Sequence, residues 1–408
     1  MTSFTLSTAE GPAFKPLPVA VTAVLTPLGG LAPEAWVVIA RAGAVLAVLL
    51  AFVIARRLAG GSIAAGAIAA VAVALCGGFP GLAAAGAETG WTLAFALLGW
   101  EAWRTGRARA ALACAVGCAL LRVEAWPFVL ALGILLWRRR PQDRALLVAC
   151  AVAVPALWFV PEWLGSGDAL RSGSRARMPN PGQPALADVP ALASLKEAAQ
   201  VLLWPLWAGV AACLFLPAAR AARLPLAAGA AWVAIVAIMA QAGFSGEPRY
   251  AIPGMALIAI AAAVGLTRFG DLWVTRTRRS PHLATAAIAA AIIVAAAPRV
   301  ADLPDLRSSQ AYQRGLATDL ERLIADAGRN ELLACGRPYV GDLRGPLLAY
   351  HLDVEKRRVA FVPAPPGVVF RSRLHEDAEA EPAAGPAFAA VTRDGRWEVL
   401  STCGVRGP

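Results

Sequence analysis

Long apolar blocks separated by short polar breaks run through most of this chain. The blocks cover roughly residues 35–55, 62–80, 89–103, 108–121, 125–137, 145–162, 199–217, 224–243, 251–267 and 283–297. A helix needs about 20 apolar residues to cross the hydrocarbon core of a bilayer; some blocks reach that length and others fall short of it. The pattern predicts an all-α polytopic membrane domain of about ten transmembrane helices over residues 35–297.

The two ends of the chain break this pattern. Residues 1–34 are rich in proline and only moderately apolar, which favours an extracytoplasmic segment at the membrane interface. Residues 298–408 begin with an amphipathic helix, "SSQAYQRGLATDLERLIADAG". Four later stretches are typical of strands: "NELLACG", "RRVAFVP", "PGVVFRS" and "AFAAVTRDGRWEVLSTC", the last with a turn at its "DG" pair. We therefore expect a small α/β or α+β domain at 298–408.

Charge supports a membrane protein and predicts its orientation. Only 16% of the residues are charged, 58% are hydrophobic, and the net charge is +11, almost all of it from arginine. Arginines cluster after every second block: Arg56 and Arg57; Arg104, Arg107 and Arg109; Arg138, Arg139, Arg140 and Arg144; Arg220 and Arg223; Arg268, Arg276, Arg278 and Arg279. Such loops are cytoplasmic by the positive-inside rule, so we expect a multi-pass plasma-membrane protein whose 298–408 domain is extracytoplasmic. We attribute the positive charge to topology and not to nucleic-acid binding.

Cysteine and histidine usage suggests one disulfide and no cofactor. Cys335 and Cys403 are the two cysteines of the C-terminal domain, which should lie in an oxidising compartment, so we predict that they pair. The alternative is two independent buried thiols. The three histidines are scattered without metal-ligand spacing, so no cofactor is evident, although the pattern leaves a divalent metal open.

Three predicted outward loops carry candidate site residues. Glu88, in "GAETG", could contact a ligand, but its position favours a cap for the helix beginning near Thr89. Arg122 and Glu124, in "LLRVEAWP", lie near a span end, where ionisable residues face a cavity or form a salt bridge; the sequence does not choose between these. Arg249 and Tyr250 belong to "SGEPRYAIPG"; the arginine could hold a lipid-linked phosphate, but its position slightly favours a side chain that extends to the headgroups.

A fourth loop, "GSGDALRSGSRARMPNPG", concentrates cations against the positive-inside trend. Its candidate residues are Asp168, Arg171, Arg175 and Arg177. Guanidinium groups match phosphate oxygens, so this loop could form an anion site, or it could be a solvated surface, because long loops escape the rule. No nucleotide-binding or hydrolase motif appears in the sequence.

Several of these segments together resemble a known family. "AFKPLPVAVTAVLTPLGG", "GAETG", "LLRVEAWPF", "GSGDALRSGSRAR" and "EPRYAIPG" occur in an order that is similar to actinobacterial multi-span proteins of the GT-C glycosyltransferase superfamily, over roughly residues 10–300. The family includes arabinofuranosyl- and mannosyltransferases that build bacterial cell-envelope glycans. The resemblance implies transfer of a sugar from a polyprenyl-phosphate donor to a glycan, lipid or protein acceptor on the outer face. It also implies that Arg249 contacts the donor phosphate and that the 163–198 loop covers the site.

One part of the family pattern is missing. The family normally supplies a carboxylate base from an acidic loop after the first span, and here only Glu10 precedes "FKPLPV". We therefore expect this chain to lack an N-terminal span and its acidic loop, and to be inactive as written unless Glu10, Glu88 or Glu124 serves as the base. A multi-span transporter or flippase is the alternative function, weakened by the absence of an internal repeat; a non-catalytic membrane scaffold is a third.

Overall fold

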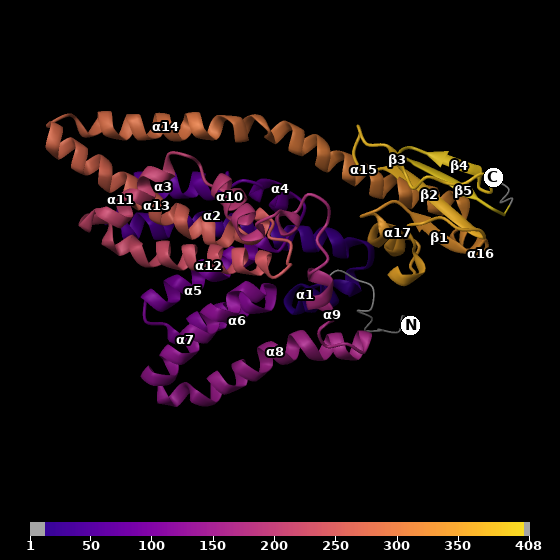
Figure 1. Ribbon diagram of the computed structural model, residues 1–408, viewed down its shortest axis with the longest axis horizontal. Helices are drawn as coiled ribbons and strands as arrows, with labels where there is room; N and C mark the ends of the chain where they lie inside the picture. Colours follow the sequence, from indigo (N-terminus) through magenta and orange to yellow (C-terminus); the bar gives the residue numbers. More distant parts are fainter. Residues whose placement is uncertain (1–12, 404–408) are drawn as a thin grey trace. The chain divides into compact units, whose positions relative to one another are not determined.

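The computed structural model of the chain describes residues 13–403, which form a helical unit ending at Ala301 and a mixed unit beginning at Asp302 (Figure 1). Glu10 and the start of the predicted interfacial segment lie outside the described residues. The first unit contains α1 (Pro16–Leu25), η1 (Thr26–Leu31), α2 (Ala32–Leu58), α3 (Ile63–Ala74), α4 (Phe79–Ala84), α5 (Thr89–Arg104), α6 (Ala108–Leu121), η2 (Val123–Ala125) and α7 (Trp126–Arg139). It continues with η3 (Pro141–Asp143), α8 (Arg144–Ser166), α9 (Arg171–Ala176), η4 (Pro184–Leu186), α10 (Pro190–Val201), α11 (Leu206–Phe215), η5 (Pro217–Ala222), α12 (Arg223–Gln241), α13 (Pro248–Thr277) and α14 (Pro281–Ala301).

The helical unit is a multi-pass membrane domain. Among the described residues, five helical stretches are long and apolar enough to cross a bilayer: Pro16–Leu58, Pro141–Ser166, Pro217–Gln241, Pro248–Thr277 and Pro281–Ala327. A sixth span would be the pair α10 and α11, which meet at an angle of 104°. The predicted count of ten therefore stays a prediction, because several of the other helices are too short for a straight span.

One sequence prediction for this unit needs correction. A straight span at 199–217 is wrong, because α10 ends at Val201 and α11 begins only at Leu206 in a new direction. The intervening residues include Pro205, and the segment is apolar throughout, so hydropathy alone does not reveal the break. The part of the predicted interfacial segment that is described begins with helix α1, which continues through η1 into α2.

Helix α13 forms the centre of the helical unit. Its residues from Ala251 to Leu266 are buried all round, and it packs mainly on α11 and α12. Glycines allow the backbones to touch: a Cβ added to Gly209 would lie 2.1 Å from the carbonyl oxygen of Ala262, and one added to Gly229 would lie 2.5 Å from that of Gly254. Small residues at such crossings permit the close van der Waals packing that associates helices in a bilayer.

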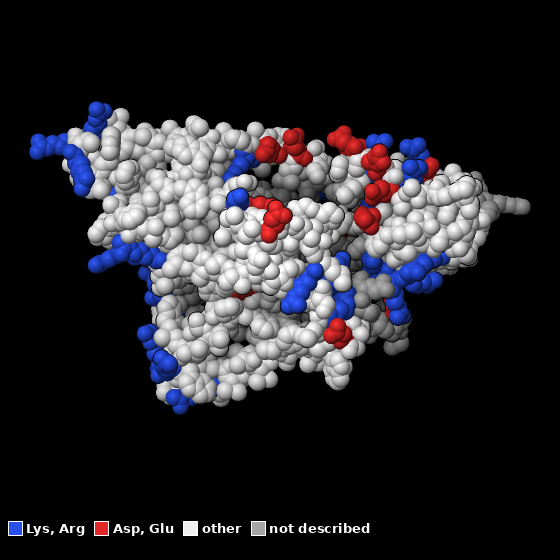
Figure 2. Space-filling model, viewed as in Figure 1, with Lys and Arg blue, Asp and Glu red and all other residues white. Residues whose placement is uncertain are grey.

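The arginine-rich loops meet at one end of the helical unit. Figure 2 shows basic side chains gathered at the end where α13 turns into α14 and α7 into α8 (compare Figure 1). Arg57, at the end of α2, forms an ion pair with Glu101 of α5, and Arg268 of α13 donates to the Ala59 carbonyl at 2.9 Å. Loops that the sequence assigns to the cytoplasm are thus neighbours in space.

The second unit is an α+β domain with a mixed sheet. It contains α15 (Leu303–Ala327), α16 (Arg329–Ala334), β1 (Arg337–Val340), α17 (Gly345–His351), η6 (Lys356–Arg358), β2 (Gly367–Arg373), β3 (Ala380–Glu381), β4 (Ala389–Asp394) and β5 (Trp397–Ser401). The sheet order is β1-β2-β5-β4, with β3 also paired to β2, and only the β1–β2 pair is parallel. Leu316 and Leu320 of α15 pack with Phe370 and Trp397 in the core on one face of this sheet.

The sequence patterns predicted some elements of this domain correctly and others wrongly. The amphipathic helix, β2 and the β4–β5 hairpin are present, with Gly395 in the hairpin turn at φ +52°. Two predicted strands are wrong: "NELLACG" lies mostly in α16, and "RRVAFVP" is a 3₁₀ turn followed by a single bridge at Ala360. Short apolar runs do not distinguish a helix from a strand, and the Glu, Leu and Ala of the first run are strong helix formers. A disulfide joins Cys335 and Cys403, whose Cα atoms are 5.7 Å apart.

Candidate functional site

A cavity of about 430 Å³ lies in the helical unit. Its walls come from α6, η2, α7, α8, α9 and α12, together with the residues just before α1 and the start of α13. Aromatic and aliphatic side chains form most of the lining, including Trp126, Trp158, Phe159, Val236 and Met239. The charged residues in the described lining are Lys15, Arg122, Glu124 and Arg177. The cavity therefore combines a large apolar wall with a few charged groups, as sites for amphiphilic ligands do.

Arg122 and Glu124 reach the cavity because the chain turns sharply between α6 and α7. Helix α6 ends at Leu121, Arg122 takes an extended conformation (φ −145°, ψ 128°), and the short η2 turn follows. Arg122 is 7% exposed and Glu124 is 4% exposed, although both are ionisable. Burial of a charged group costs free energy unless the group is paired or contacts a ligand. This turn is therefore a candidate functional site.

Lys15, Glu88 and Arg122 form a charged cluster beside the cavity. The Glu88 carboxylate accepts from the Lys15 ammonium and lies 2.9 Å from a guanidinium nitrogen of Arg122. The Arg122 guanidinium also lies 4.7 Å from the centre of the Tyr250 ring, a cation–π contact. Four segments far apart in the sequence meet here: the residues before α1 and α5, the α6–α7 turn, and the start of α13.

The structure corrects the predicted role of Glu88 as a helix cap. Glu88 precedes α5, but its side chain makes no capping hydrogen bond and is used in the ion pairs instead. Burial raises the pKa of this carboxyl, but Arg122 and Lys15 lower it more, so that the pKa is about 2. A carboxylate that ionises so readily is a weak proton acceptor near neutral pH, which makes Glu88 a poor general base.

Glu124 differs from Glu88 in its contacts. It lines the cavity, and within residues 13–403 no hydrogen bond or ion pair engages its carboxylate. The sequence left open whether Arg122 and Glu124 pair with each other. In the structure Arg122 pairs with Glu88, and Glu124 faces the cavity without that partner. Of the two carboxylates that the sequence offered as weak catalytic candidates, Glu124 lines the cavity and Glu88 does not.

The four candidate residues of the 163–198 loop do not form one anion site. Asp168 accepts the backbone N–H of Leu170 at 2.8 Å, and Arg171 lies 3.5 Å from the buried carboxylate of Glu162. Arg175 is exposed, and neither it nor Arg171 is part of the cavity lining. Arg177 is in the lining, with its guanidinium 5.1 Å from the ring centre of Phe244. The loop contributes one cation to the cavity, and α9 forms part of its wall.

Arg249 and Tyr250 also have different surroundings. Tyr250 lines the cavity, and its carbonyl accepts the indole N–H of Trp232 at 2.8 Å. Arg249 does not line the cavity; it lies 2.6 Å from a Glu247 oxygen and 5.1 Å from the Tyr250 ring centre, with 44% of its side chain exposed. The resemblance implied that Arg249 contacts a donor phosphate, whereas the residues alone slightly favoured a side chain that extends to the headgroups. In the structure Arg122, and not Arg249, lines the cavity.

Lys15 is the charged lining residue that the sequence analysis did not single out. The chain has only three lysines against many arginines, so a lysine within the quoted "FKPLP" segment was a signal in itself. Its neighbour Phe14 donates its backbone N–H to the Ser172 hydroxyl of α9 at 2.7 Å, which ties this segment to the cavity wall. Within the described residues, no group of three or more His, Cys, Asp or Glu side chains could hold a metal ion.

Comparison with known proteins yields one structural similarity. No protein-family model and no curated protein matches the sequence. The structure is similar to the crystal structure of ArnT from Cupriavidus metallidurans in the apo state, with a TM-score of 0.53 and 16% sequence identity, over 97% of this chain and 88% of that chain. At this identity the similarity concerns the fold, and it extends over nearly the whole chain.

Proposed function

We propose that this protein is a membrane glycosyltransferase of the GT-C type, which transfers a sugar from a polyprenyl-phosphate donor to a cell-envelope acceptor. The observation that carries the proposal is the cavity, where a large apolar wall adjoins Lys15, Arg122 and a buried carboxylate, Glu124. A polyprenyl-phosphate sugar has matching parts: a lipid chain, an anionic phosphate and a sugar. The fold shared with ArnT, a GT-C transferase of 4-amino-4-deoxy-L-arabinose, supports the same class.

The position of the cavity fits a donor presented on the outer face. Helix α5 begins next to Glu88 of the charged cluster and ends at Arg104, and α13 begins near Tyr250 and ends in the Arg276–Arg279 loop. The cavity and the arginine-rich loops are therefore at opposite ends of the same helices. If those loops are cytoplasmic, the cavity opens on the extracytoplasmic side.

In the proposed reaction Glu124 takes the proton of an acceptor hydroxyl as its oxygen bonds to the anomeric carbon of the sugar. The bond between that carbon and the phosphate oxygen breaks, and polyprenyl phosphate leaves with an additional negative charge. Arg122 and Lys15 stabilise this charge, because fixed cations in a poorly solvated site interact strongly with charge that develops in the transition state. Glu88 holds both cations in position, and Arg122 keeps further N–H donors for the phosphate.

Proteoliposomes that contain the 408-residue chain test this proposal. Polyprenyl-phosphate arabinofuranose and polyprenyl-phosphate mannose, each labelled in the sugar, are supplied with a cell-envelope extract as acceptor. We expect one donor to release polyprenyl phosphate and label the acceptor, and Glu124→Gln to reduce this rate about 100-fold or more, as loss of a general base does. Glu101→Gln is the control, because Glu101 is a carboxylate at the opposite end of α5.

Two results would contradict the proposal. If Glu124→Gln transfers sugar at the wild-type rate, Glu124 is not the general base. If the donor crosses the bilayer without being cleaved, the protein is a flippase instead. If neither donor is cleaved or moved by wild-type chain, the transferase proposal is wrong for the protein as it stands.

A further inference from the structure

We propose that the C-terminal unit binds an acidic glycan, a saccharide chain with carboxylate or phosphate groups, in a groove on its sheet. This arginine groove has a volume of about 550 Å³, and its charged lining consists of Arg371, Arg373, Arg393 and Arg396 with Glu376 and Glu398. It lies within residues 302–403 and is a separate site from the cavity of the helical unit. The inference does not depend on the proposed transfer reaction.

The strand pattern places Arg371, Arg373 and Arg393 on one face of the sheet, whereas Arg396 lies in the β4–β5 turn and contacts Asp319 and the Tyr312 ring of α15. Side chains alternate along β2, so Phe370 and Ser372 face the buried side while Arg371 and Arg373 point to the other. Glu398 of β5 is in register with Arg371 on one side and with Arg393 of β4 on the other, so the three residues form a row across the sheet. Helix α15 covers the opposite face with its core residues, which leaves the row open to solvent.

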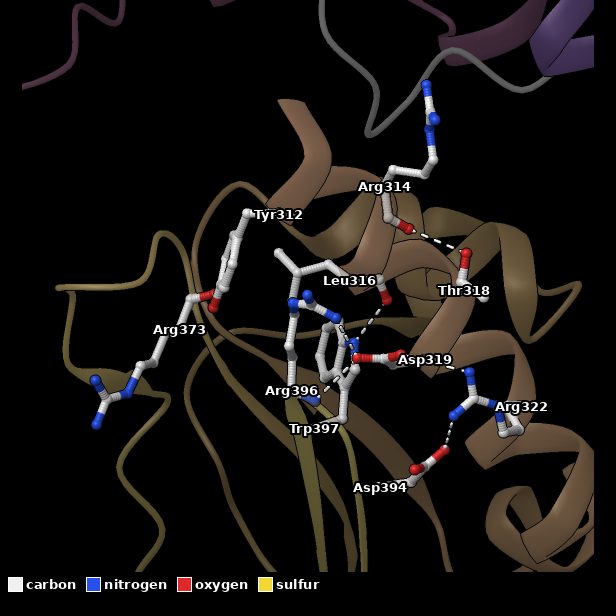
Figure 3. A network of polar contacts seen from close by, with 10 residues as sticks. All are labelled: Tyr312, Arg314, Leu316, Thr318, Asp319, Arg322, Arg373, Asp394, Arg396 and Trp397. Carbon is white, nitrogen blue, oxygen red and sulfur yellow. Dashed lines mark hydrogen bonds and ion pairs between the residues drawn. The ribbon is translucent and has the colours of Figure 1, made fainter. Parts of the chain in front are cut away.

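Several groove arginines are held in place by the protein. Asp319 of α15 accepts from the Arg396 guanidinium at 2.7 Å and from its backbone N–H at 3.1 Å (Figure 3). The same carboxylate lies between Arg396 and Arg322 (Figure 3). Because these contacts fix the side chain beforehand, less conformational entropy is lost when a ligand binds.

The strand arginines are also partly engaged. Arg371 is 3.5 Å from a Glu398 oxygen and donates to the Ala380 carbonyl at 3.3 Å, and Arg373 donates to the Glu376 carbonyl at 3.0 Å. Among the described residues no hydrogen bond or ion pair engages the Arg393 side chain. A guanidinium has five N–H donors in a planar fork, so each arginine retains donors that match a carboxylate or a phosphate.

The positive charge is a local feature of this domain. Residues 302–408 contain 14 Arg and Lys and 15 Asp and Glu, so the domain as a whole is nearly neutral. The groove has four arginines and two glutamates, so it is more positively charged than the domain as a whole. Charge complementarity favours an anionic partner.

Two observations favour a glycan over a lipid surface or a nucleic acid. The glutamates can accept hydrogen bonds from sugar hydroxyls, whereas they would repel the closely spaced phosphates of a nucleic acid. Basic surfaces that bind membranes usually carry apolar side chains that enter the bilayer. Here the exposed apolar residues Leu343, Phe361 and Val362 lie beside the β1 edge, away from the groove over β2, β5 and β4.

Fluorescence anisotropy with the full chain in detergent tests the inference. The probes are labelled tetragalacturonate and a labelled phosphomannan oligosaccharide, with maltotetraose as the neutral comparison. We expect wild type to bind an acidic probe, more weakly as salt rises, and maltotetraose at least tenfold more weakly. The variant Arg371→Gln/Arg393→Gln should bind the acidic probe about tenfold more weakly, since it loses charge-assisted hydrogen bonds.

The matched control is Arg357→Gln/Arg358→Gln, which removes the same charge from exposed residues of η6. It should bind within about twofold of wild type, because exposed charges outside the site contribute little. Should the groove double variant unfold, Arg393→Gln alone replaces it, because within residues 13–403 that side chain has no hydrogen bond or ion pair to lose.

Any of three outcomes overturns the proposal. They are absence of binding to both acidic probes by wild type, equal binding of maltotetraose, and an equal loss of affinity in the groove and control variants. Reconstitution in nanodiscs adds a fourth: if phosphatidylglycerol abolishes glycan binding that persists in phosphatidylcholine, the groove binds lipid headgroups and the glycan assignment is wrong.

Discussion

Two arginines flank Tyr250, but only Arg122 lies in the cavity wall. Arg122 pairs with Glu88 and is almost fully buried, whereas Arg249 pairs with Glu247 and is partly exposed. A lysine at position 122 keeps the charge but loses the planar fork that can contact carboxylate and phosphate together. We therefore expect Arg122→Lys to raise the donor KM about tenfold or more, the effect of losing one charge-assisted hydrogen bond.

Arg249 contacts the same Tyr250 ring as Arg122, so Arg249→Lys is the matched control for Arg122→Lys. We expect Arg249→Lys to change the donor KM by less than about twofold, because exposed ion pairs contribute little free energy. Transfer kinetics at varied donor concentration measure both variants, after size-exclusion chromatography has shown them monodisperse. Equal effects of the two substitutions would mean that Arg249 reaches the donor as the sequence resemblance had suggested, and that the cavity in the structure is not the phosphate site.

The two carboxylates near the cavity should differ in what they stabilise. Glu88→Gln leaves Lys15 and Arg122 without their anionic partner in a poorly solvated place, and breaking a buried pair costs about 3–5 kcal/mol. No ion pair engages Glu124 in the part of the chain that the structure describes, so Glu124→Gln should leave stability within about 1 kcal/mol of wild type. Thermal unfolding in detergent by intrinsic fluorescence compares them.

The pH dependence follows from the same pairing. The folded pKa of Glu88, about 2, is below its ordinary value of 4.5, so its stabilising contribution is complete above pH 4.5 and is lost as the pH falls towards 2. The stability difference between Glu88→Gln and wild type should therefore be constant from pH 5 to 8 and shrink only below that range. A difference that changes near neutral pH would show that the Glu88 cluster is not formed as described.

At the level of elements, hydropathy predicted the helices well and their breaks poorly. The blocks at 35–55, 89–103, 108–121 and 224–243 each lie within or close to one helix. The bend between α10 and α11 was missed because apolar content does not change across it. The sequence indicated Arg122, Glu124 and Tyr250 one at a time, but it did not indicate Lys15 or predict that these residues meet. Lys15 and Tyr250 are separated by most of the membrane domain, and one sequence does not show which distant loops are in contact.

Helix α10 ends at the break before α11, and Arg299 of α14 contacts its last carbonyls together with that at the end of α3. Its guanidinium donates to the carbonyls of Leu75, Gln200, Val201 and Leu202 at 2.6–3.2 Å. The C-terminal carbonyls of α3 and α10 have no helical partners and carry partial negative charge, so a cation is suited to both.

We expect Arg299→Gln to lower the unfolding free energy in detergent by about 3 kcal/mol or more, since hydrogen bonds to charged groups contribute about 1.5–3 kcal/mol each and a glutamine amide replaces at most two of the four. Arg278→Gln, at the exposed end of α13, is the control and should be neutral. Thermal unfolding of the two variants in the same detergent compares them. An unchanged Arg299→Gln protein would mean that water or lipid satisfies these carbonyls as well as the arginine does.

At the scale of the whole molecule, the orientation of the helices in the membrane decides whether the cavity can reach a donor on the outer face. Arg109 and Arg140 both contact Asp143, at 2.8 and 3.0 Å, so the loops after α5 and α7 are joined at the arginine-rich end. This end should be cytoplasmic, and an odd number of crossings between the α13–α14 loop and the C-terminal unit then places that unit outside. The Cys335–Cys403 disulfide suits that compartment, because cytosolic thiols are usually kept reduced.

Labelling of intact cells with a membrane-impermeant maleimide tests this orientation. Arg279→Cys, in the α13–α14 loop, should label only after the membrane is permeabilised, whereas Glu379→Cys, on an exposed part of the C-terminal unit, should label without it; the unsubstituted chain gives the background. Labelling of Arg279→Cys in intact cells would reverse the topology and open the cavity to the cytoplasm. A donor displayed on the outer leaflet could then not reach Arg122 and Glu124. Labelling at neither position in intact cells would require an even number of crossings after the α13–α14 loop, which leaves the cavity outside but removes the argument for an oxidised C-terminal unit.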